Sequence, residues 1–257
     1  MNIIKNINRI KKGIREKGLF GFLKRLCMWL FQPLRPIVWF CGSHLVIHKL
    51  KNVRTRNKEE LFYFSSRIFF SVIKPLQIKS EILNLLSIIE ERRPKIVLEI
   101  GTSFGGVLFL LCKTIPEDSI IISLDLPGVD GGYPEWRKRL YNEFISNKQS
   151  LHLIKADSHD ESSVKQIENV LHGKKVDFLF IDGDHTYDGV KRDFLMYRHL
   201  VGSIGIIAFH DIAHHSEDSG CEVDRFWGEI KKEYESLEII EDRNQGWGGI
   251  GILYVKQ

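Results

Sequence analysis

Short apolar runs alternate with amphipathic stretches from about residue 76 to the end of the chain, and no other feature constrains the fold as strongly. Runs typical of buried strands lie at 95–101, 119–126, 151–157, 176–182, 203–211, 237–241 and 250–255. Stretches with helical periodicity lie at 59–73, 79–92, 105–113, 134–145, 161–172, 189–200 and 222–234. Strands separated by helical stretches of about 10–15 residues indicate βαβ units, so we predict an α/β fold with a parallel sheet.

Carboxylates stand at the same point of several predicted strands, where each strand ends. They are Asp125, Asp157, Asp182 and Asp211. In open α/β sheets the ligand binds outside the carboxyl ends of the strands. We therefore expect these four side chains to converge on one crevice, with helix capping as the alternative role for single members.

The first of these strands runs into a glycine-rich turn, EIGTSFGG, which extends from Glu99 to Gly106. Gly101 allows a tight turn, and Gly105 helps to open the next helix beside a ligand. Asp125 follows Gly101 by 24 residues and ends the second strand, where an acid can accept hydrogen bonds from ribose hydroxyls. The spacing differs from the GxGxxG of dinucleotide sites, so the turn predicts a nucleoside site but not an NAD site.

Charge is divided unevenly along the chain. Residues 1–58 hold 14 Lys and Arg against one acid, a net of +13, whereas residues 59–257 hold 23 Lys and Arg against 32 acids, a net of −9. We predict a boundary at this point, between a basic arm (1–58) and a catalytic domain (59–257). A basic arm on an acidic body suggests an anionic partner for the arm.

The arm combines a basic, amphipathic helical pattern with an apolar segment. From Leu26 to Ile47 there are 22 residues with a single charge, Arg35. That length could cross a bilayer, but a central Arg between Pro33 and Pro36 disfavours a clean span. We expect an in-plane or re-entrant anchor on an anionic membrane. The alternative is packing on protein, and the high apolar content argues against nucleic acid as the partner.

Four cysteines are scattered without a CxxC pair: Cys27, Cys41, Cys112 and Cys221. This pattern fits a reducing compartment and gives no zinc signature. No secretory signal is recognisable near the N-terminus. We therefore expect a cytoplasmic protein, peripheral or monotopic at the inner face of the cell membrane. A homo-oligomer is compatible with the sequence.

Together the motifs resemble those of class I S-adenosylmethionine-dependent methyltransferases of the small-molecule and sugar O-methyltransferase type, over roughly residues 76–257. FIDGDHTYDGVKRDF, FHDI and VDRFWGEI resemble a subgroup of bacterial glycan and antibiotic-sugar methyltransferases, which includes macrocin O-methyltransferase-like and cephalosporin hydroxylase-like proteins. The resemblance implies a Rossmann-like sheet of seven strands, parallel except for a terminal antiparallel hairpin, after a basic amphipathic N-terminal helical region. It also implies S-adenosylmethionine as the cofactor.

The resemblance further assigns the donor site. Its implied contacts are Glu99, Gly101, Thr102, Ser103, Gly105, Asp125, Asp157 and Asp182. Glu99 and Gly101 would lie near the methionine part, Asp125 at the ribose and Asp157 near the adenine. Thr102 and Ser103 depart from the small residues of the commonest form of this motif.

Methyl transfer to a hydroxyl requires removal of a proton, and a divalent cation can assist by lowering the hydroxyl pKa. Asp182 and Asp211 resemble the metal ligands of catechol-type methyltransferases, and Asp184 or His210 could complete a Mg²⁺ site. In those enzymes the position of His185 carries the base, so we predict His185 as general base and His210 as the second candidate. A metal-free site, with these acids as caps or substrate contacts, is the alternative.

Three residues near the C-terminal helix are predicted to contact the acceptor. Trp227 could stack on a sugar face, Arg225 could bind an anion, and His214 lies on the preceding loop. Packing of the helix on the sheet is the alternative for this segment.

We therefore predict an O-methyltransferase that modifies a hydroxyl of a saccharide or lipid-linked glycan at the cytoplasmic membrane face. Methylation of a soluble natural product, or a non-catalytic nucleoside-binding scaffold, are the alternatives. An oxygenase is a further one, because His210, Asp211 and His214 could form a set of two histidines and one carboxylate.

Overall fold

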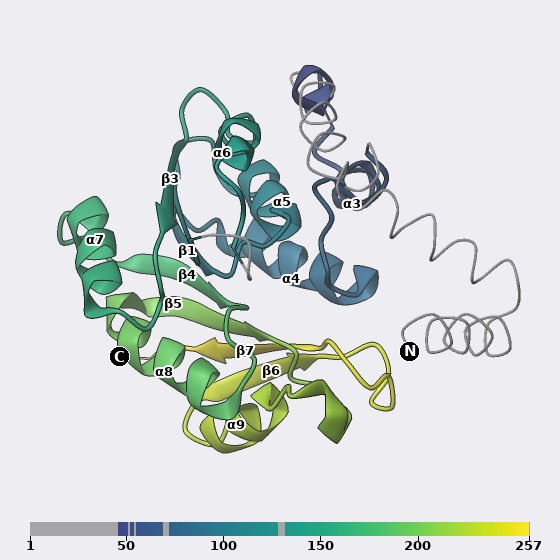
Figure 1. The fold of residues 1–257 in the computed structure, drawn as a ribbon, viewed down its shortest axis with the longest axis vertical. Helices are drawn as coiled ribbons and strands as arrows, with labels where there is room; N and C mark the ends of the chain where they lie inside the picture. The colour runs from purple at the N-terminus through teal and green to yellow at the C-terminus, as the bar shows by residue number, and fades with distance from the viewer. Residues whose placement is uncertain (1–45, 51, 54, 69–71, 128–131, 257) are drawn as a thin grey trace, which may run out of the picture. The chain divides into compact units, whose positions relative to one another are not determined.

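Seven strands form one sheet in the order β3-β2-β1-β4-β5-β7-β6 (Figure 1). The strands are β1 (Ile96–Ile100), β2 (Ile120–Asp125), β3 (Ser150–Lys155), β4 (Val176–Ile181), β5 (Val201–His210), β6 (Glu235–Ile239) and β7 (Ile250–Tyr254). Strands β1 to β5 pair in parallel, whereas β7 runs antiparallel to β5 and β6. The structure is a computed structural model that describes residues 46–50, 52–53, 55–68, 72–127 and 132–256. The predicted Rossmann-like sheet with a terminal antiparallel hairpin is confirmed.

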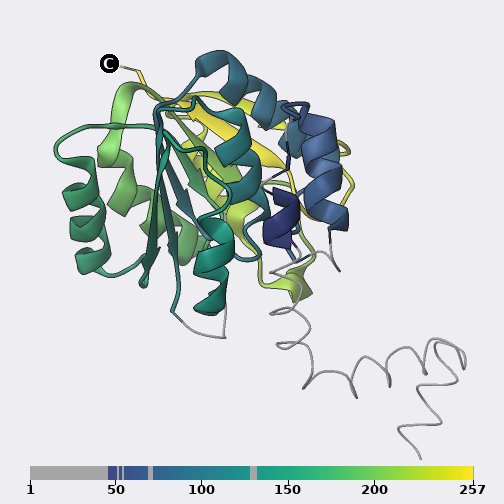
Figure 2. The ribbon, with the colours of Figure 1, turned by 90° about the horizontal axis from the view of Figure 1, so that it is seen from above.

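Helices cover both faces of the sheet. They are α3 (Lys58–Arg67), α4 (Lys79–Arg92), α5 (Gly106–Thr114), α6 (Trp136–Tyr141), α7 (Glu161–Leu171), α8 (Tyr187–Tyr197) and α9 (Val223–Ile230). Helices α3 to α6 contribute to the core on one face, and α7 to α9 contribute to the core on the other. In Figure 2 the blue helices of the first group and the green helices of the second lie on opposite sides of the sheet.

The central strands are apolar along their whole length because both of their faces are covered. Every residue of β1 is buried, and its side chains alternate between the two cores: Val97 joins one, while Leu98 and Ile100 join the other. Full burial of such a side chain stabilises the fold by about 1.5–3 kcal/mol. The alternation places the end of β1, and the turn after it, between two packed layers.

Helix boundaries follow the sequence signals at most but not all positions. Helix α4 matches the predicted helix at 79–92. The helix predicted at 59–73 ends earlier, because the backbone of Ile68 is extended after Arg67. Helix α6 covers only part of the predicted 134–145, and the chain continues there as turns.

The predicted basic arm lies almost wholly outside the described residues, as does most of the apolar segment at 26–47. Within the described part of the chain, no helix has the length and apolar character needed to span a membrane. Val46, Ile47 and Leu50 are buried in the core that also holds Leu61. Apolar side chains on the N-terminal side of residue 58 therefore pack with the domain, and the division at residue 58 stays a prediction.

Candidate active site

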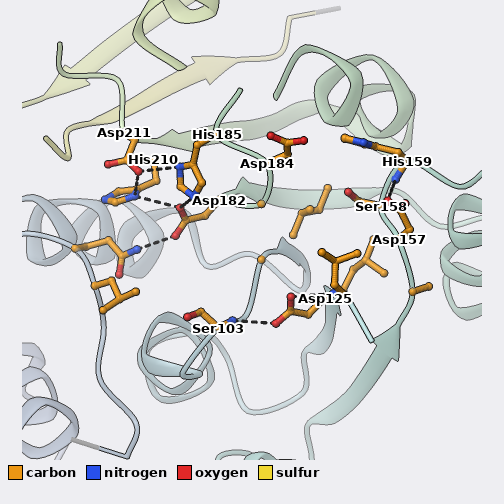
Figure 3. A pocket seen from close by; sticks show the side chains of 18 of the residues that line it. Ser103, Asp125, Asp157, Ser158, His159, Asp182, Asp184, His185, His210 and Asp211 are labelled. Atoms are coloured by element: carbon orange, nitrogen blue, oxygen red, sulfur yellow. Dashed lines mark hydrogen bonds and ion pairs between the residues drawn. The ribbon is translucent and has the colours of Figure 1, made fainter. Parts of the chain in front are cut away.

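A cavity of about 820 Å³ opens at the carboxyl ends of the parallel strands. All four predicted strand-end acids line it: Asp125, Asp157, Asp182 and Asp211 (Figure 3). They come from the ends of β2, β3, β4 and β5, which lie within one sheet. The parallel topology therefore brings together carboxylates that are far apart in the sequence.

The turn after β1 forms one wall of this cavity. Gly101 has a φ of 92°, and a Cβ there would lie 2.0 Å from the carbonyl oxygen of Asp182, so only glycine fits. The next residues turn towards β2, and the backbone N–H of Ser103 donates to Oδ2 of Asp125 at 3.0 Å (Figure 3). The turn and the acid at the end of β2 are thus held as one unit.

Asp125 keeps acceptor capacity for a ligand. Its Oδ2 accepts from Ser103 and its Oδ1 accepts from the N–H of Leu126 at 2.8 Å, and each carboxylate oxygen can accept a second hydrogen bond. Burial raises the pKa of Asp125 to about 6, and the two N–H donors oppose that rise. At neutral pH the group is therefore mainly ionised and able to accept hydroxyl donors.

Glu99 lies below the turn and does not reach the cavity. Its side chain is fully buried, and burial raises the pKa of the carboxyl to about 8. The hydroxyl of Ser123 donates to Oε2 at 3.1 Å, whereas Oε1 has no hydrogen-bond partner among the described residues. Thr102 contacts Ser123 in the same buried group. Glu99, Thr102 and Gly105 therefore support the turn from behind, while Gly101, Ser103, Asp125, Asp157 and Asp182 line the cavity.

At the other end of the cavity, two carboxylates and two imidazoles form a cluster (Figure 3). Nδ1 of His185 lies 2.9 Å from Oδ2 of Asp211, and Nδ1 of His210 lies 3.1 Å from Oδ1 of Asp182. His210 also lies 3.3 Å from Oδ2 of Asp211. The side-chain amide of Gln77 donates to Oδ2 of Asp182 at 2.8 Å. The cluster thus links the ends of β4 and β5.

The charges in this cluster shift its pKa values in opposite directions. Hydrogen bonds to Asp211 and Cys221 raise the pKa of His185 to about 11, against the effect of burial. Burial alone would lower the pKa of His210, but Asp182 and Asp211 raise it to about 10. Burial would raise the pKa of Asp211, and the two histidines outweigh it and lower that pKa well below its usual range. By themselves, these groups favour imidazolium–carboxylate pairs at neutral pH.

Within the described residues, two groups of side chains have the spacing to hold a metal ion. One is Asp182, His210 and Asp211, and the other is His185, Asp211 and Cys221; the ligand atoms of each lie within 4.8 Å of one another. The first group, with its two carboxylates, fits a hard divalent cation. Asp184 also lines the cavity but belongs to neither group, and its Oδ1 accepts from the N–H of Thr186 at 2.9 Å.

The three predicted acceptor residues do not line the cavity. Trp227 is buried against β5 and β7, and its Nε1 donates to Glu238. Arg225 lies over the ring of Tyr187, and His214 is exposed and pairs with Asp224. The helical spacing of Val223, Phe226, Trp227 and Ile230, all buried, was the signal that this helix face belongs to the core.

Further residues line the cavity near the imidazole–carboxylate cluster. Trp247 and Leu76 are each 45% exposed at the cavity, and His215 lies 3.4 Å from Oδ1 of Asp211. Gly246 and Gly248, which flank Trp247, both have positive φ, and that local signal marks a tight loop that projects the side chain. Near Asp125 and Asp157, His159 and Leu126 also line the cavity.

Part of the chain is similar to known proteins. Residues 98–212 match the family model of a methyltransferase domain. The uncharacterized protein R132 of Acanthamoeba polyphaga mimivirus is 34% identical over 114 residues, which cover 44% of this chain and 50% of that protein. The uncharacterized protein y4gI of Sinorhizobium fredii is 22% identical over 165 residues, which cover 63% of this chain and 17% of that protein.

Solved structures share the fold. The O-methyltransferase TomG from Streptomyces achromogenes, in complex with SAM, has a TM-score of 0.54 and 15% identity, over 80% of this chain and 92% of that one. The O-methyltransferase from Bacillus cereus, in complex with SAH, has a TM-score of 0.55 and 18% identity, over 79% and 92%. At such identities the likeness concerns the fold. Residues 98–212 thus match a methyltransferase domain, and they lie within a seven-stranded, Rossmann-like sheet whose fold is shared with these O-methyltransferases.

Proposed function

We propose that the protein transfers a methyl group from S-adenosylmethionine to a hydroxyl of a small-molecule acceptor. The observation that carries this proposal is that one cavity holds both a nucleoside-type subsite, at Ser103 and Asp125, and an imidazole–carboxylate cluster, at His185 and Asp211. Methyl transfer is a displacement in line with the breaking bond, so donor and acceptor must be held in one space. Two proteins of the same fold were solved as O-methyltransferases with SAM or SAH.

The donor would lie along the ends of β1, β2 and β3. Asp125 has acceptor capacity for the ribose hydroxyls, and Asp157, Ser158 and His159 line the cavity beyond it, where the adenine would lie. Gly101, which packs against the backbone of Asp182, lines the cavity where the methionine part would lie. The cluster at β4 and β5 lies at the other end of the same cavity, where an acceptor would bind.

His185 is the residue best placed to take the acceptor proton. Asp211 engages Nδ1 at 2.9 Å, whereas Nε2 lies 4.0 Å from Oδ1 of Asp182, beyond hydrogen-bond distance, and would take the acceptor proton; the side chain is 42% exposed. A divalent cation such as Mg²⁺, held by Asp182, Asp211 and His210, would lower the pKa of an acceptor hydroxyl by its positive charge. The carboxylates that raise the His185 pKa are the same ones that would bind this cation. A cation that offsets their charge would lower the pKa of His185 towards its ordinary range, where imidazole can act as a base.

The acceptor class that we favour has a flat, weakly polar face next to its hydroxyl, as a saccharide has. Support comes from Trp247 and Leu76, the exposed apolar side chains at the acceptor end of the cavity. A sugar or lipid-linked glycan fits this rim, and the basic arm would bring the domain to an anionic membrane where such a glycan resides. A soluble natural product with a similar face is the second candidate, because the same rim would accept it.

The test is transfer of a labelled methyl group. Purified protein, Mg²⁺ and S-adenosylmethionine with a deuterated methyl group are incubated with methyl glycosides and with a lipid-linked glycan extract, and products are analysed by mass spectrometry. We expect a deuterated methyl on a hydroxyl, and His185→Ala should reduce its rate by about 10²–10⁴-fold. His214→Ala is the matched control, since that exposed imidazole lies off the cavity. Full turnover in His185→Ala would exclude it as the base.

A further inference from the structure

Cys221 lies against the proposed base, although the proposed methyl transfer uses no thiol. Its Sγ, a ring nitrogen of His185 and a carboxylate oxygen of Asp211 all lie within 4.8 Å of one another. The side chain of Cys221 is partly exposed, and that of His185 is 42% exposed, so a solute can reach this group.

The backbone holds this thiol beside the imidazole. The N–H of Glu222, the residue after Cys221, donates to the carbonyl oxygen of His185 at 2.8 Å. The N–H of Cys221 donates to the hydroxyl of Ser219 at 3.1 Å. Two segments, one after β4 and one before α9, therefore meet through their main chains. The juxtaposition of thiol and imidazole is built into the fold rather than made by two long side chains.

The donor atoms of this group select a particular kind of ion. Thiolate and imidazole are the preferred ligands of Zn²⁺ and similar borderline ions, whereas Mg²⁺ prefers oxygen ligands and water. A tetrahedral ion with bonds of about 2.0–2.3 Å places its ligand atoms roughly 3.5 Å apart, which small side-chain shifts can reach from the present spacing. The group at Asp182, His210 and Asp211 offers two carboxylates and no sulfur, so it differs in kind. The two groups share Asp211.

We propose that Cys221, His185 and Asp211 form a binding site for a thiophilic divalent cation of the Zn²⁺ class, and that its occupation switches off the proposed methyl transfer. Binding forms metal–sulfur, metal–nitrogen and metal–oxygen bonds and releases the thiol proton, and any imidazolium proton, to solvent. The regulatory half rests on the proposed function: the ion engages the imidazole that takes the acceptor proton and the carboxylate that orients it.

Cobalt tests the site itself, because a thiolate ligand gives Co²⁺ a charge-transfer band in the near ultraviolet. The full-length, reduced, metal-free protein is titrated with Co²⁺ and then with Zn²⁺ in competition. We expect the band in the wild type and its loss in Cys221→Ser, with Zn²⁺ affinity at least tenfold weaker. Cys112→Ala, which removes a thiol buried in α5, is the matched control and should keep the band, as should Asp182→Asn. No band in the wild type, or an equal band in Cys221→Ser, would overturn the site.

Two further readouts separate this inference from the proposed function. S-adenosylhomocysteine affinity, measured by calorimetry, should be unchanged in Cys221→Ser, because Cys221 lies at the acceptor end. A protein that binds this nucleoside but shows no thiolate band contradicts the metal site alone, and the reverse result contradicts the proposed function alone. For the regulatory half, Zn²⁺ should inhibit labelled methyl transfer in the wild type and at least tenfold less effectively in Cys221→Ser. Equal inhibition of both would contradict it.

Discussion

At the scale of single residues, Glu99 shows how burial controls a charge beneath the site. Its pKa of about 8 exceeds its ordinary value of 4.5, so between these values the folded state binds more protons than the unfolded state. The contribution of Glu99 to the free energy of unfolding is therefore fully present below pH 4.5, and it is lost as the pH rises towards 8. The charged form is the one that the fold disfavours.

We therefore expect Glu99→Gln to stabilise the protein at pH 8 and to matter little at pH 5, the two ends of that window. The amide keeps the shape of the carboxyl without its charge. Each kcal/mol recovered should raise Tm by about 2–4 °C in a protein of this size. Differential scanning calorimetry at both pH values checks this, and a larger gain at the lower pH would contradict the assignment.

Two tryptophans show which single residues could be predicted. The strand-end acids were found correctly because parallel topology alone brings strand ends to one edge. Trp227, which was predicted to contact the acceptor, is buried in the core instead, because packing decides which side an amphipathic helix face lies on. Trp247 lies at the cavity instead, on a loop whose path depends on tertiary contacts.

Stability should separate these two tryptophans. Trp227→Ala removes a side chain packed between Phe209 and Gly251, so we expect a loss of about 3–5 kcal/mol. Trp247→Ala, at a position that is 45% exposed, should change the free energy of unfolding by less than about 1 kcal/mol. Urea unfolding followed by circular dichroism measures both, and similar losses would contradict the packing described here.

At the scale of elements, the loop between β6 and β7 is tied to two distant parts of the fold. Buried Glu81, on α4, accepts from the N–H of Glu241, from the amide of Gln245 and from the N–H of Gly249. The N–H of Gly248 donates to Oδ1 of Asp211 at 3.0 Å. The loop that carries Trp247 is thus held by a helix on one side and by the active-site cluster on the other.

Glu81→Ala should loosen this loop without affecting the donor subsite. It leaves the buried N–H of Gly249 without its acceptor, so we expect a loss of about 1–3 kcal/mol, and it also removes the hydrogen bonds from Glu241 and Gln245. Hydrogen exchange should accelerate at 241–249 while S-adenosylhomocysteine affinity stays unchanged. Exposed Glu91, on the same helix, gives the control Glu91→Ala. Unchanged hydrogen exchange at residues 241–249 would contradict the role of the Glu81 hydrogen bonds in holding the loop.

Sequence periodicity predicted the order and type of the elements better than their ends. Helix and strand periodicities are local, so all seven strands of the sheet were found. Helix α3 ends short of its apolar pattern, because the chain leaves the helix at Ile68 to pack on the core. The hydrogen bonds between Glu81 and the loop that begins at Glu241 could not be predicted, because they join residues about 160 positions apart.

At the scale of the whole molecule, the basic arm and the acidic domain suggest separate roles. Val46, Ile47 and Leu50 pack in the domain core, so a truncation should remove residues 1–45 and not 1–58. We expect the full chain to sediment with phosphatidylglycerol vesicles, less so at high salt, and the truncated chain to stay in the supernatant. Neutral phosphatidylcholine vesicles are the control. Equal binding by both chains would contradict the membrane role of the arm.

The central claim is that the carboxyl edge of the sheet binds an adenosyl donor through Asp125. Titration calorimetry with S-adenosylhomocysteine tests it on the wild type, on Asp125→Asn and on the control Asp118→Asn, whose exposed acid precedes the same strand. We predict saturable one-to-one binding by the wild type and the control. Asp125→Asn should bind at least tenfold more weakly, a loss of about 1.4 kcal/mol or more. Absence of binding by the wild type, or equal affinity in all three proteins, would contradict the account.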